Sequence, residues 1–308
     1  MTEPSLQSRI FRQIVRVGAA PLLNHRLPVR LQRWPTDLLL RVAILPENTR
    51  VETVSGEHWS AELVRVGQTV GELAQGCVLY FHGGAYNIGS PRGHRNVVAH
   101  LSEACGLPVL SVDYRLAPEH PYPAALQDAE AAWQFLLSQG VPANKIVVAG
   151  DSAGGGLSLA LVLRLRQNKQ ALPGGIGLFS PWVDLSLSQP SYKSHARQDP
   201  MLNRQWLWRM AKNYAGKHLL SEPGISPLFA DYRDMPPLYI QVGEHEMLLD
   251  DARNLARKAK QSGVSVELQV WPNMWHVWQF EAGLMPEASR AVECMAGFVR
   301  NRVRRDAA

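Results

Sequence analysis

The stretch from Lys145 to Leu161 contains the feature that most constrains the fold, a Gly-x-Ser-x-Gly corner between an apolar run and a helical segment. The run Ile146 to Ala149 predicts a short buried strand, and the small, apolar residues after Gly156 predict a helix. The corner is so sharp that Ser152 is under backbone strain, and its hydroxyl is lifted above the sheet at a helix N-terminus. A helix cap or a phosphate-binding loop shares this short pattern, so the rest of the chain has to decide between these interpretations.

Length and composition favour one large α/β domain with a lid, because 308 residues with 46% hydrophobic content can bury a sizeable core. The net charge is +5, but the basic residues are dispersed except near the two ends, and no nucleic-acid-binding motif is present, so we expect no nucleic-acid partner. Cys77, Cys105 and Cys294 lie far apart, which indicates a reducing, cytoplasmic compartment without a disulfide framework or a metal site. No stretch reaches the ~20 apolar residues of a membrane span.

The N-terminal segment predicts cap helices over residues 1–50. It has no apolar core of the kind found in a secretory signal, and Glu3 lies near its start. An amphipathic helix lying in a membrane interface would share its pattern, but we expect a helix that packs over the active site. The pattern places apolar residues on one face with arginines beside them: Ile10, Phe11, Ile14, Val15 and Val17, with Arg9, Arg12 and Arg16.

Apolar runs alternate with helical segments along the rest of the chain, which predicts a mostly parallel sheet with helices on both faces. Residues 51–184 and 225–308 are expected to form this core, and residues 185–224, where the alternation breaks, a cap insertion. The predicted strands are Glu62 to Val66 (outer), Cys77 to Phe81 (central), Pro108 to Val112, Ile146 to Ala149, Gly175 to Phe179, Pro237 to Val242 and Val264 to Val270 (outer). The predicted helices include Arg92 to Cys105, Ala124 to Gln139 and Glu287 to Arg300.

A His-Gly-Gly loop follows the predicted central strand and begins at His82. Adjacent glycines let backbone amides turn into a cleft, which suits an oxyanion hole, although a flexible hairpin would show the same residues. The loop and the Ser152 corner both follow apolar strands, so both can open on the same edge of a doubly wound sheet. His82 is expected to shape the loop rather than act as a base, and the proline-rich segment Asp113 to Pro123 to support it.

The chain then offers a serine, an acidic loop and a histidine in the order of the α/β-hydrolases. A serine hydroxyl needs a base within hydrogen-bond reach, and the base needs a carboxylate to orient it. His276 is the best base because it follows the last predicted strand on a short loop. Glu246, Asp250 and Asp251 compete as the acid, and we favour Glu246, which is closest to the strand end, over two carboxylates placed to cap a helix.

Several motifs together resemble the bacterial hormone-sensitive lipase-like esterases. The resemblance is carried by HGGAYNIGS (His82 to Ser90), DYRLAPEHPYPAA (Asp113 to Ala125), GDSAGGG (Gly150 to Gly156), Asp199-Pro200, Gly243 to Asp251 and His276. It implies an α/β-hydrolase fold with a helical cap, no cofactor, and hydrolysis of short- to medium-chain acyl esters. It also implies Ser152 as nucleophile, His276 as base, and an oxyanion hole from the amides of Gly83, Gly84 and Ala153. The family's D-x-L-x-D pattern falls on Glu246 to Asp250 here, so a glutamate stands where an aspartate is common.

Four residues are predicted to line the substrate pocket: Tyr86, Asp151, Trp206 and Met210. Ala85, which stands in place of a third glycine, is expected to narrow this pocket. A lactone hydrolase or a metabolite-specific deacetylase would use the same residues. A non-catalytic ligand-binding protein of the same fold is a further alternative, against which His276 argues. The alternating segment Val264 to Val270 makes edge-to-edge pairing into a homodimer plausible.

Overall fold

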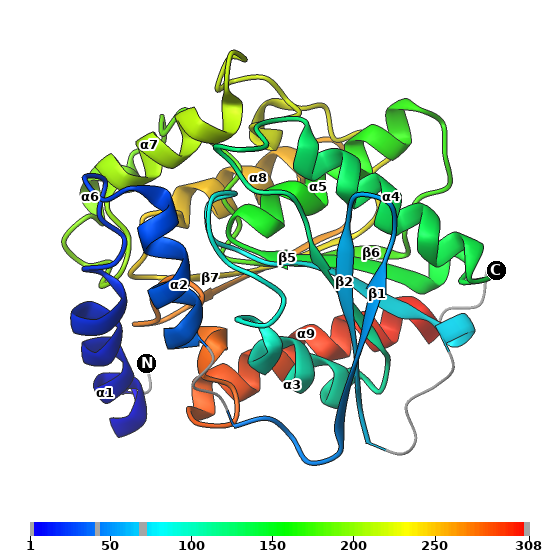
Figure 1. The fold of residues 1–308 in the computed structure, drawn as a ribbon, viewed down its shortest axis with the longest axis horizontal. Helices are drawn as coiled ribbons and strands as arrows, with labels where there is room; N and C mark the ends of the chain where they lie inside the picture. The colour runs from blue at the N-terminus through cyan, green and yellow to red at the C-terminus, as the bar shows by residue number, and fades with distance from the viewer. Residues whose placement is uncertain (1–2, 41–43, 68–72, 305–308) are drawn as a thin grey trace.

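The computed structural model describes residues 3–40, 44–67 and 73–304 and contains an eight-stranded sheet (Figure 1). The order across the sheet is β1-β2-β4-β3-β5-β6-β7-β8. The two pairs that involve β2 are antiparallel, and the other neighbouring strands are parallel. The strands are β1 Thr49–Ser55, β2 Ser60–Val66, β3 Cys77–Phe81, β4 Val109–Asp113, β5 Ile146–Asp151, β6 Gly175–Phe179, β7 Leu238–Gly243 and β8 Val266–Trp271.

The interior of the sheet follows the sequence prediction closely, and one edge does not. The expectation that the segment of β2 forms an outer strand is wrong, because β2 pairs with β4 on one side and with β1 on the other. The segment of β1 is mostly polar and exposed, so it lacks the apolar pattern by which the other strands were predicted. β8 forms the opposite edge of the described sheet, as expected.

Helices cover both faces of the sheet (Figure 1). One face packs on α3 (Arg95–Cys105) and α9 (Pro286–Arg304), and the other on α4 (Ala124–Ser138), α5 (Ala153–Gln167) and α8 (Leu249–Gln261). Within β3, Leu79 and Phe81 join the core on one face, whereas Val78 and Tyr80 join the core on the other. Burial on both faces explains why this strand is apolar throughout instead of alternating. The predicted α/β-hydrolase class of fold is confirmed.

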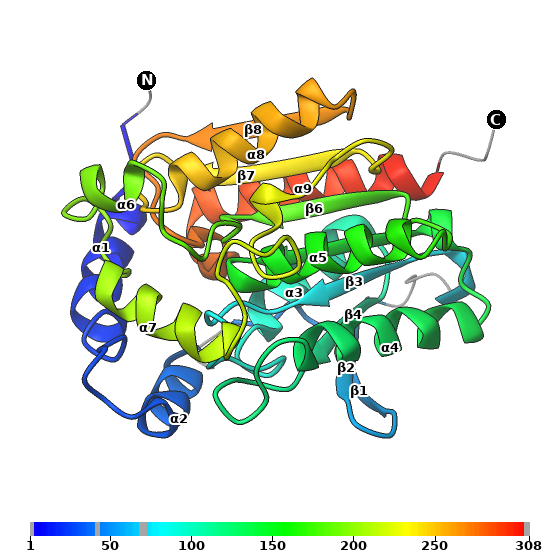
Figure 2. The same cartoon turned by 90° about the horizontal axis from the view of Figure 1, so that it is seen from above.

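A group of helices covers the end of the sheet toward which the parallel strands run (Figure 2). It comprises α1 (Leu6–Ile14), the π-helical turn η1 (Val15–Ala19), α2 (Val29–Leu40), α6 (Ser191–Ser194) and α7 (Arg204–Ala215). The short 3-10 helices are η2 Leu73–Gln75, η3 Ala143–Lys145, η4 Pro227–Phe229 and η5 Trp278–Glu281. Over the residues that the structure describes, no helix is both long and apolar enough to cross a membrane. Substrate-binding sites of open α/β sheets lie at this carboxyl end of the strands.

Candidate active site

Ser152 occupies the corner between β5 and α5 with φ +51° and ψ −118°, a backbone conformation that is strained for a residue with a side chain. Its amide donates to the Phe179 carbonyl at 2.9 Å, and its own carbonyl accepts from the Trp182 amide at 2.9 Å. These bonds hold the strained corner in place. A Cβ at Gly154 would overlap the carbonyl oxygen of Phe81, so β3 and the start of α5 can approach this closely only around a glycine.

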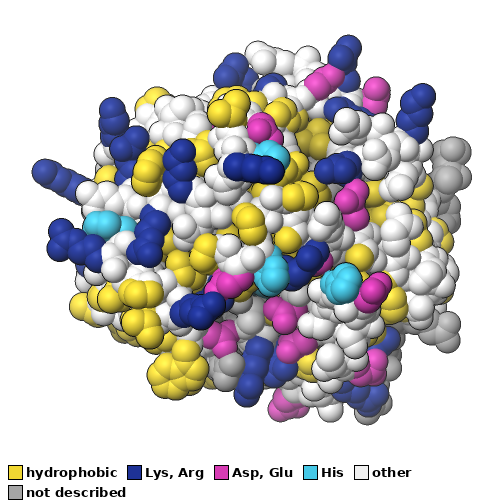
Figure 3. Space-filling view, turned by 45° about the horizontal axis from the view of Figure 1, so that its top comes forward, with side chains coloured by type: hydrophobic (Ala, Val, Ile, Leu, Met, Phe, Trp, Pro, Cys, Tyr) yellow, Lys and Arg dark blue, Asp and Glu magenta, His cyan; other side chains and the backbone are white. Residues whose placement is uncertain are grey.

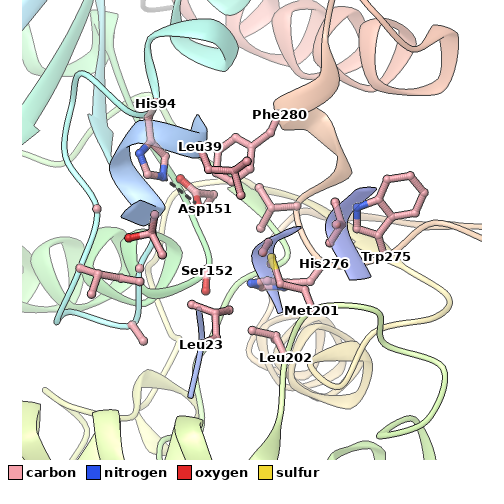
Figure 4. Close-up of a pocket in the computed structure, with 18 of the residues that line it drawn as sticks. Leu23, Leu39, His94, Asp151, Ser152, Met201, Leu202, Trp275, His276 and Phe280 are labelled. Atoms are coloured by element: carbon pink, nitrogen blue, oxygen red, sulfur yellow. Dashed lines mark ion pairs between the residues drawn. The ribbon is translucent and has the colours of Figure 1, made fainter. Parts of the chain in front are cut away.

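The imidazole of His276 is brought to Ser152 from the loop after β8. Both residues line one cavity (Figure 4). The Nδ1 atom of the imidazole lies 2.7 Å from Oε2 of Glu246, which follows β7. The second carboxylate oxygen of Glu246 accepts from the Gly243 amide at 2.9 Å. Both oxygens of the carboxylate therefore have partners, and the ring orientation of His276 is fixed.

Asp250 and Asp251 are engaged elsewhere. Asp250 accepts from the Ser191 amide at 3.0 Å. Asp251 accepts from the amides of Val183 and Asp184 through one oxygen. Of the three acidic residues considered from the sequence, the structure brings Glu246 to the histidine.

The electrostatics of the pair favour a protonated imidazole. Burial alone lowers the pKa of His276, but the hydrogen bond and charge of Glu246, with smaller contributions from Asp199 and Asp151, outweigh it and raise the pKa above its ordinary value. A base with a raised pKa accepts a proton from a hydroxyl more readily, because the imidazolium is stabilised. His245, by contrast, has its pKa lowered by burial and by the charge of Arg12.

The His-Gly-Gly loop is held by residues beneath it, as the sequence predicted. His82 stacks on Tyr114 with ring centroids 4.3 Å apart, and its Nδ1 lies 2.7 Å from the Gly83 carbonyl. The hydroxyl of Tyr114 donates to the His82 carbonyl at 2.7 Å. Burial and the nearby charge of His94 lower the pKa of His82 to about 3. The ring of His82 is therefore neutral and shapes the loop.

The hydrogen bonds of the Gly83 amide contradict the expectation that this amide belongs to the oxyanion hole. The amide donates to Oδ1 of Asp151 at 3.0 Å and lies 3.2 Å from Nε2 of His94, so it is already bonded and is not available to an oxyanion. Within the described part of the chain, nothing accepts a hydrogen bond from the amides of Gly84, Ala85 and Ala153. Of these three amides, those of Gly84 and Ala153 were predicted from the sequence, and that of Ala85 was not. The motif could have indicated Ala85, since this residue is the third after His82. A motif does not show, however, in which direction each N–H points.

Asp151 anchors this loop from below. Besides the Gly83 amide, it accepts from the Tyr80 hydroxyl at 2.8 Å, and Nε2 of His94 lies 3.6 Å from its other oxygen (Figure 4). Burial alone would raise the pKa of Asp151, but the charge and hydrogen bond of His94 and the hydrogen bond of Tyr80 lower it. Nothing in the sequence singled out His94, which falls within the predicted helix Arg92 to Cys105. Asp151 and His94 both line the cavity, so the anchor is also part of the wall.

The cavity above Ser152 has a volume of about 300 Å³. Its apolar wall comes largely from the helices that cover the sheet end, with Phe11, Ile14, Val15, Ala19, Leu23 and Leu39 on the N-terminal side and Met201, Leu202 and Trp206 on the other. Trp275, Phe280 and the carboxylate of Glu281 complete it beside His276. Glu281 is half-buried, and burial raises its pKa to about 7.

Two residues predicted for the pocket lie outside the lining of this cavity. Tyr86 is fully buried and stacks on Tyr214 with ring centroids 3.7 Å apart. Met210 is fully buried on the inner side of α7, where its carbonyl accepts from the Asn87 side chain. The predictions for Tyr86 and Met210 are wrong because both side chains are taken up by packing beneath the pocket. Asp151 and Trp206 do line the cavity.

Comparisons with known proteins agree with this arrangement. The alpha/beta hydrolase fold family matches residues 78–280. The chain is 40% identical to an acetyl-hydrolase of Streptomyces hygroscopicus over 249 residues, which cover 81% of this chain and 82% of that protein. It is 31% identical to an ethyl acetate hydrolase of Pseudomonas putida, with 78% of this chain and 77% of that protein covered.

Solved structures give the same result over nearly the whole chain. The fold is similar to the crystal structure of an esterase from the bacterial hormone-sensitive lipase family, with a TM-score of 0.92 and 36% identity, covering 98% of this chain and all of that one. A hormone-sensitive lipase from a metagenome library has a TM-score of 0.89 and 33% identity, covering 98% of this chain and all of that one. The chain belongs to the alpha/beta hydrolase fold family, and within it to the bacterial hormone-sensitive lipase-like esterases.

Proposed function

We propose that this protein is a serine carboxylesterase in which Ser152, His276 and Glu246 form the catalytic triad. The observation that carries the proposal is that the Ser152 hydroxyl, the Glu246-bound imidazole and unbonded amides belong to one apolar cavity. An ester carbonyl placed above Ser152 would have a nucleophile on one side and hydrogen-bond donors on the other.

The reaction follows from these positions. His276 takes the proton of Ser152 as the hydroxyl oxygen attacks the carbonyl carbon, and the Glu246 carboxylate stabilises the imidazolium. The amides of Gly84, Ala85 and Ala153 donate to the oxyanion. His276 then returns the proton to the leaving alcohol, which leaves an acyl group on Ser152. A water, deprotonated by His276, attacks this acyl-enzyme and releases the acid, and Ser152 recovers its proton.

The size of the cavity supports esters of short- to medium-chain acids. About 300 Å³ lies at the lower end of the range of ligand pockets, and the wall is mainly apolar. The names of two relatives, an acetyl-hydrolase and an ethyl acetate hydrolase, refer to acyl groups of this small size. We therefore propose highest kcat/KM for acetyl to butyryl esters and a decline for longer chains.

The compartment and the assembly are further parts of the proposal. Three free cysteines, two of them buried, support a reducing, cytoplasmic location. β8 is an edge strand of the described sheet, and Val270 on it is partly exposed, which supports pairing with a second copy through this edge.

The test is a panel of p-nitrophenyl esters of increasing acyl length with wild-type protein and the Ser152→Ala variant. The expected result is hydrolysis that declines with chain length in the wild type and is lost in the variant, with unchanged thermal unfolding. Undiminished hydrolysis by Ser152→Ala would remove the mechanism. A lactone or an acetylated metabolite that is turned over far faster than every simple ester would retain the triad and change the substrate class.

A further inference from the structure

The outer side of the N-terminal helices carries an apolar stripe that the catalytic site does not use. On α1 and η1 the residues Leu6, Ile10, Ile14 and Val17 are 46–74% exposed, and their spacing of four, four and three places them on one side of the helix. On α2 and the turn before it, a second stripe with the same kind of spacing is 38–72% exposed: Leu27, Leu31, Trp34 and Leu38. These eight residues are called the cap face below.

The two segments lie on the same side of the molecule in Figures 1 and 2, and they meet where η1 approaches α2. A Cβ at Gly18 of η1 would be 3.9 Å from the Leu39 side chain of α2, so the elements are in contact. Figure 3 shows hydrophobic side chains interspersed with arginine and lysine on the left of the molecule, where these helices lie. Single exposed apolar residues are common, but eight on two touching helices form a patch that marks an interaction site.

The inner sides of the same helices are apolar as well. Phe11 and Val15 of the first, and Leu39 of the second, line the cavity above Ser152. A helix that is apolar on both its inner and its outer side is normally covered on both. Ile14 belongs to both surfaces, since it is 46% exposed and also lines the cavity. The cap face is therefore continuous with the wall of the ester-binding cavity.

The segment that carries this face is positively charged, although Arg30 and Arg33 pair with Glu119. Residues 1–47 contain seven arginines and three acidic residues, a net charge of +4 out of +5 for the whole chain. Arg16 and Arg26 are exposed, and within the described ranges neither side chain pairs with a carboxylate. Arg9 pairs with Glu3, but both side chains are largely exposed, and such pairs contribute little. An anionic partner is thus complementary to this face, whereas a second copy would set two positive faces against each other.

We propose that the cap face docks on the surface of an anionic phospholipid bilayer. The apolar side chains enter the boundary between headgroups and acyl chains, and the arginines contact the lipid phosphates. Esters are more soluble in a bilayer than in water, and Ile14 lies where such a molecule passes from the bilayer surface into the cavity. The proposal goes beyond the hydrolysis of a dissolved ester and does not depend on turnover.

The experiment is co-sedimentation of the full chain with vesicles of ether-linked phosphatidylcholine, with and without about a third of ether-linked phosphatidylglycerol. Ether lipids contain no acyl ester, so binding is measured apart from hydrolysis. We expect binding to the anionic vesicles and its loss at about 0.5 M NaCl, because salt screens exposed charges. Failure of the wild-type protein to sediment with anionic vesicles overturns the proposal, whether or not the protein is an esterase.

Two matched variants locate the surface. Val17→Ser/Leu31→Ser/Trp34→Ser removes three cap-face side chains that do not line the cavity, and Trp208→Ser/Leu219→Ser removes exposed apolar side chains elsewhere. The first variant should lose at least about tenfold in vesicle binding while keeping its unfolding temperature and p-nitrophenyl acetate hydrolysis, and the second should bind as the wild type does. Equal binding by the cap-face variant, or an equal loss in both variants, contradicts the proposal.

The role of the arginines in lipid binding, and the alternative that a second copy of the chain covers the cap face, are tested separately. Arg16→Gln/Arg26→Gln should weaken binding to the anionic vesicles and reduce its dependence on salt. Unchanged binding would contradict an anionic partner. Sedimentation equilibrium without lipid covers the remaining alternative: a dimer that the cap-face variant dissociates would show that a second copy covers this face, which overturns the lipid assignment.

Discussion

At the scale of single residues, Glu246 is the most informative position, because the family resemblance implies an aspartate there and this chain has a glutamate. Its longer side chain reaches Nδ1 of His276 at 2.7 Å while its other oxygen remains bonded to the Gly243 amide. The carboxylate is fully buried, so its charge acts on the imidazole with little screening by water.

Glu246→Gln should lower kcat for p-nitrophenyl acetate by about 10⁴-fold, as loss of the triad charge does in a serine protease. The amide can no longer stabilise an imidazolium or fix the tautomer. Asp250→Asn is the matched control, because Asp250 accepts from the Ser191 amide and does not contact His276. A large loss in the control, with Glu246→Gln near wild type, would reassign the acid.

Glu281 predicts a dependence of stability on pH. Burial raises the pKa of its carboxyl to about 7 from 4.5, so the folded state binds a proton more tightly than the unfolded state does. The contribution of this carboxyl to the free energy of unfolding therefore falls by at most about 3 kcal/mol as the pH rises from about 4.5 to 7. Glu281→Gln should raise the unfolding temperature at pH 8 and leave it unchanged at pH 4. Equal effects at both pH values would show that the carboxyl titrates normally.

Single residues also show where the sequence stopped being informative. The motifs identified Ser152, Glu246 and His276, because each follows a strand at a recognisable distance. The direction of the Gly83 amide depends on an acceptor 68 residues away, Asp151, and no local pattern carries that information. Tyr86 was misplaced for the same reason, since its stacking on Tyr214 arises only when two distant segments pack.

At the scale of elements, prediction succeeded where burial is complete. β3 and β6 have the predicted bounds, and β5 has the predicted start. A strand that is buried on both faces has an uninterrupted apolar sequence, which makes it easy to predict. β1 was missed because it is an exposed edge strand whose pairing with β2 is set by backbone hydrogen bonds rather than by apolar side chains. The corner between β5 and α5 was predicted because its geometry requires glycine.

The requirement for glycine at this corner can be tested with two Gly→Ala substitutions, one at the corner and one in an open position. Gly154→Ala places a Cβ against backbone atoms of Phe81 and His82, which cannot move without displacing β3, and should destabilise the protein by more than about 3 kcal/mol. Gly297→Ala lies within α9, where the nearest atom to a new Cβ is 3.9 Å away, and should stabilise by up to about 1 kcal/mol. Urea unfolding midpoints measure both changes. Tolerance of alanine at position 154 would contradict the close approach of β3 to α5.

At the scale of the whole molecule, polar contacts at several points attach the N-terminal helices to the rest of the protein. Arg12 of α1 donates to the Gln198 carbonyl at 2.8 Å and lies 2.8 Å from Nδ1 of His245. Ser5 binds the Glu287 carboxylate through both its amide and its hydroxyl. Since α1 supplies part of the cavity wall, these contacts connect the position of the cap to substrate binding. The division into cap and core segments proposed from the sequence stays a prediction.

Arg12→Met should therefore raise KM for p-nitrophenyl butyrate by about tenfold with a much smaller change in kcat, because charge-assisted hydrogen bonds of roughly 1.5–3 kcal/mol are lost far from the reacting atoms. Arg9→Met, one turn earlier, removes only an exposed pair with Glu3 and should leave both constants unchanged. Steady-state kinetics on the two variants decides the matter. A fall in kcat with constant KM would show instead that Arg12 acts on the triad.

The central claim is that Ser152 attacks the substrate with the help of His276, and covalent labelling tests it most directly. Wild-type protein is treated with a fluorophosphonate, digested and analysed by mass spectrometry, in parallel with His276→Ala and Ser152→Ala. The account predicts one label per chain on the peptide containing Ser152, much slower labelling in His276→Ala and none in Ser152→Ala. Rapid labelling of a different residue, or equal labelling of all three proteins, would contradict it.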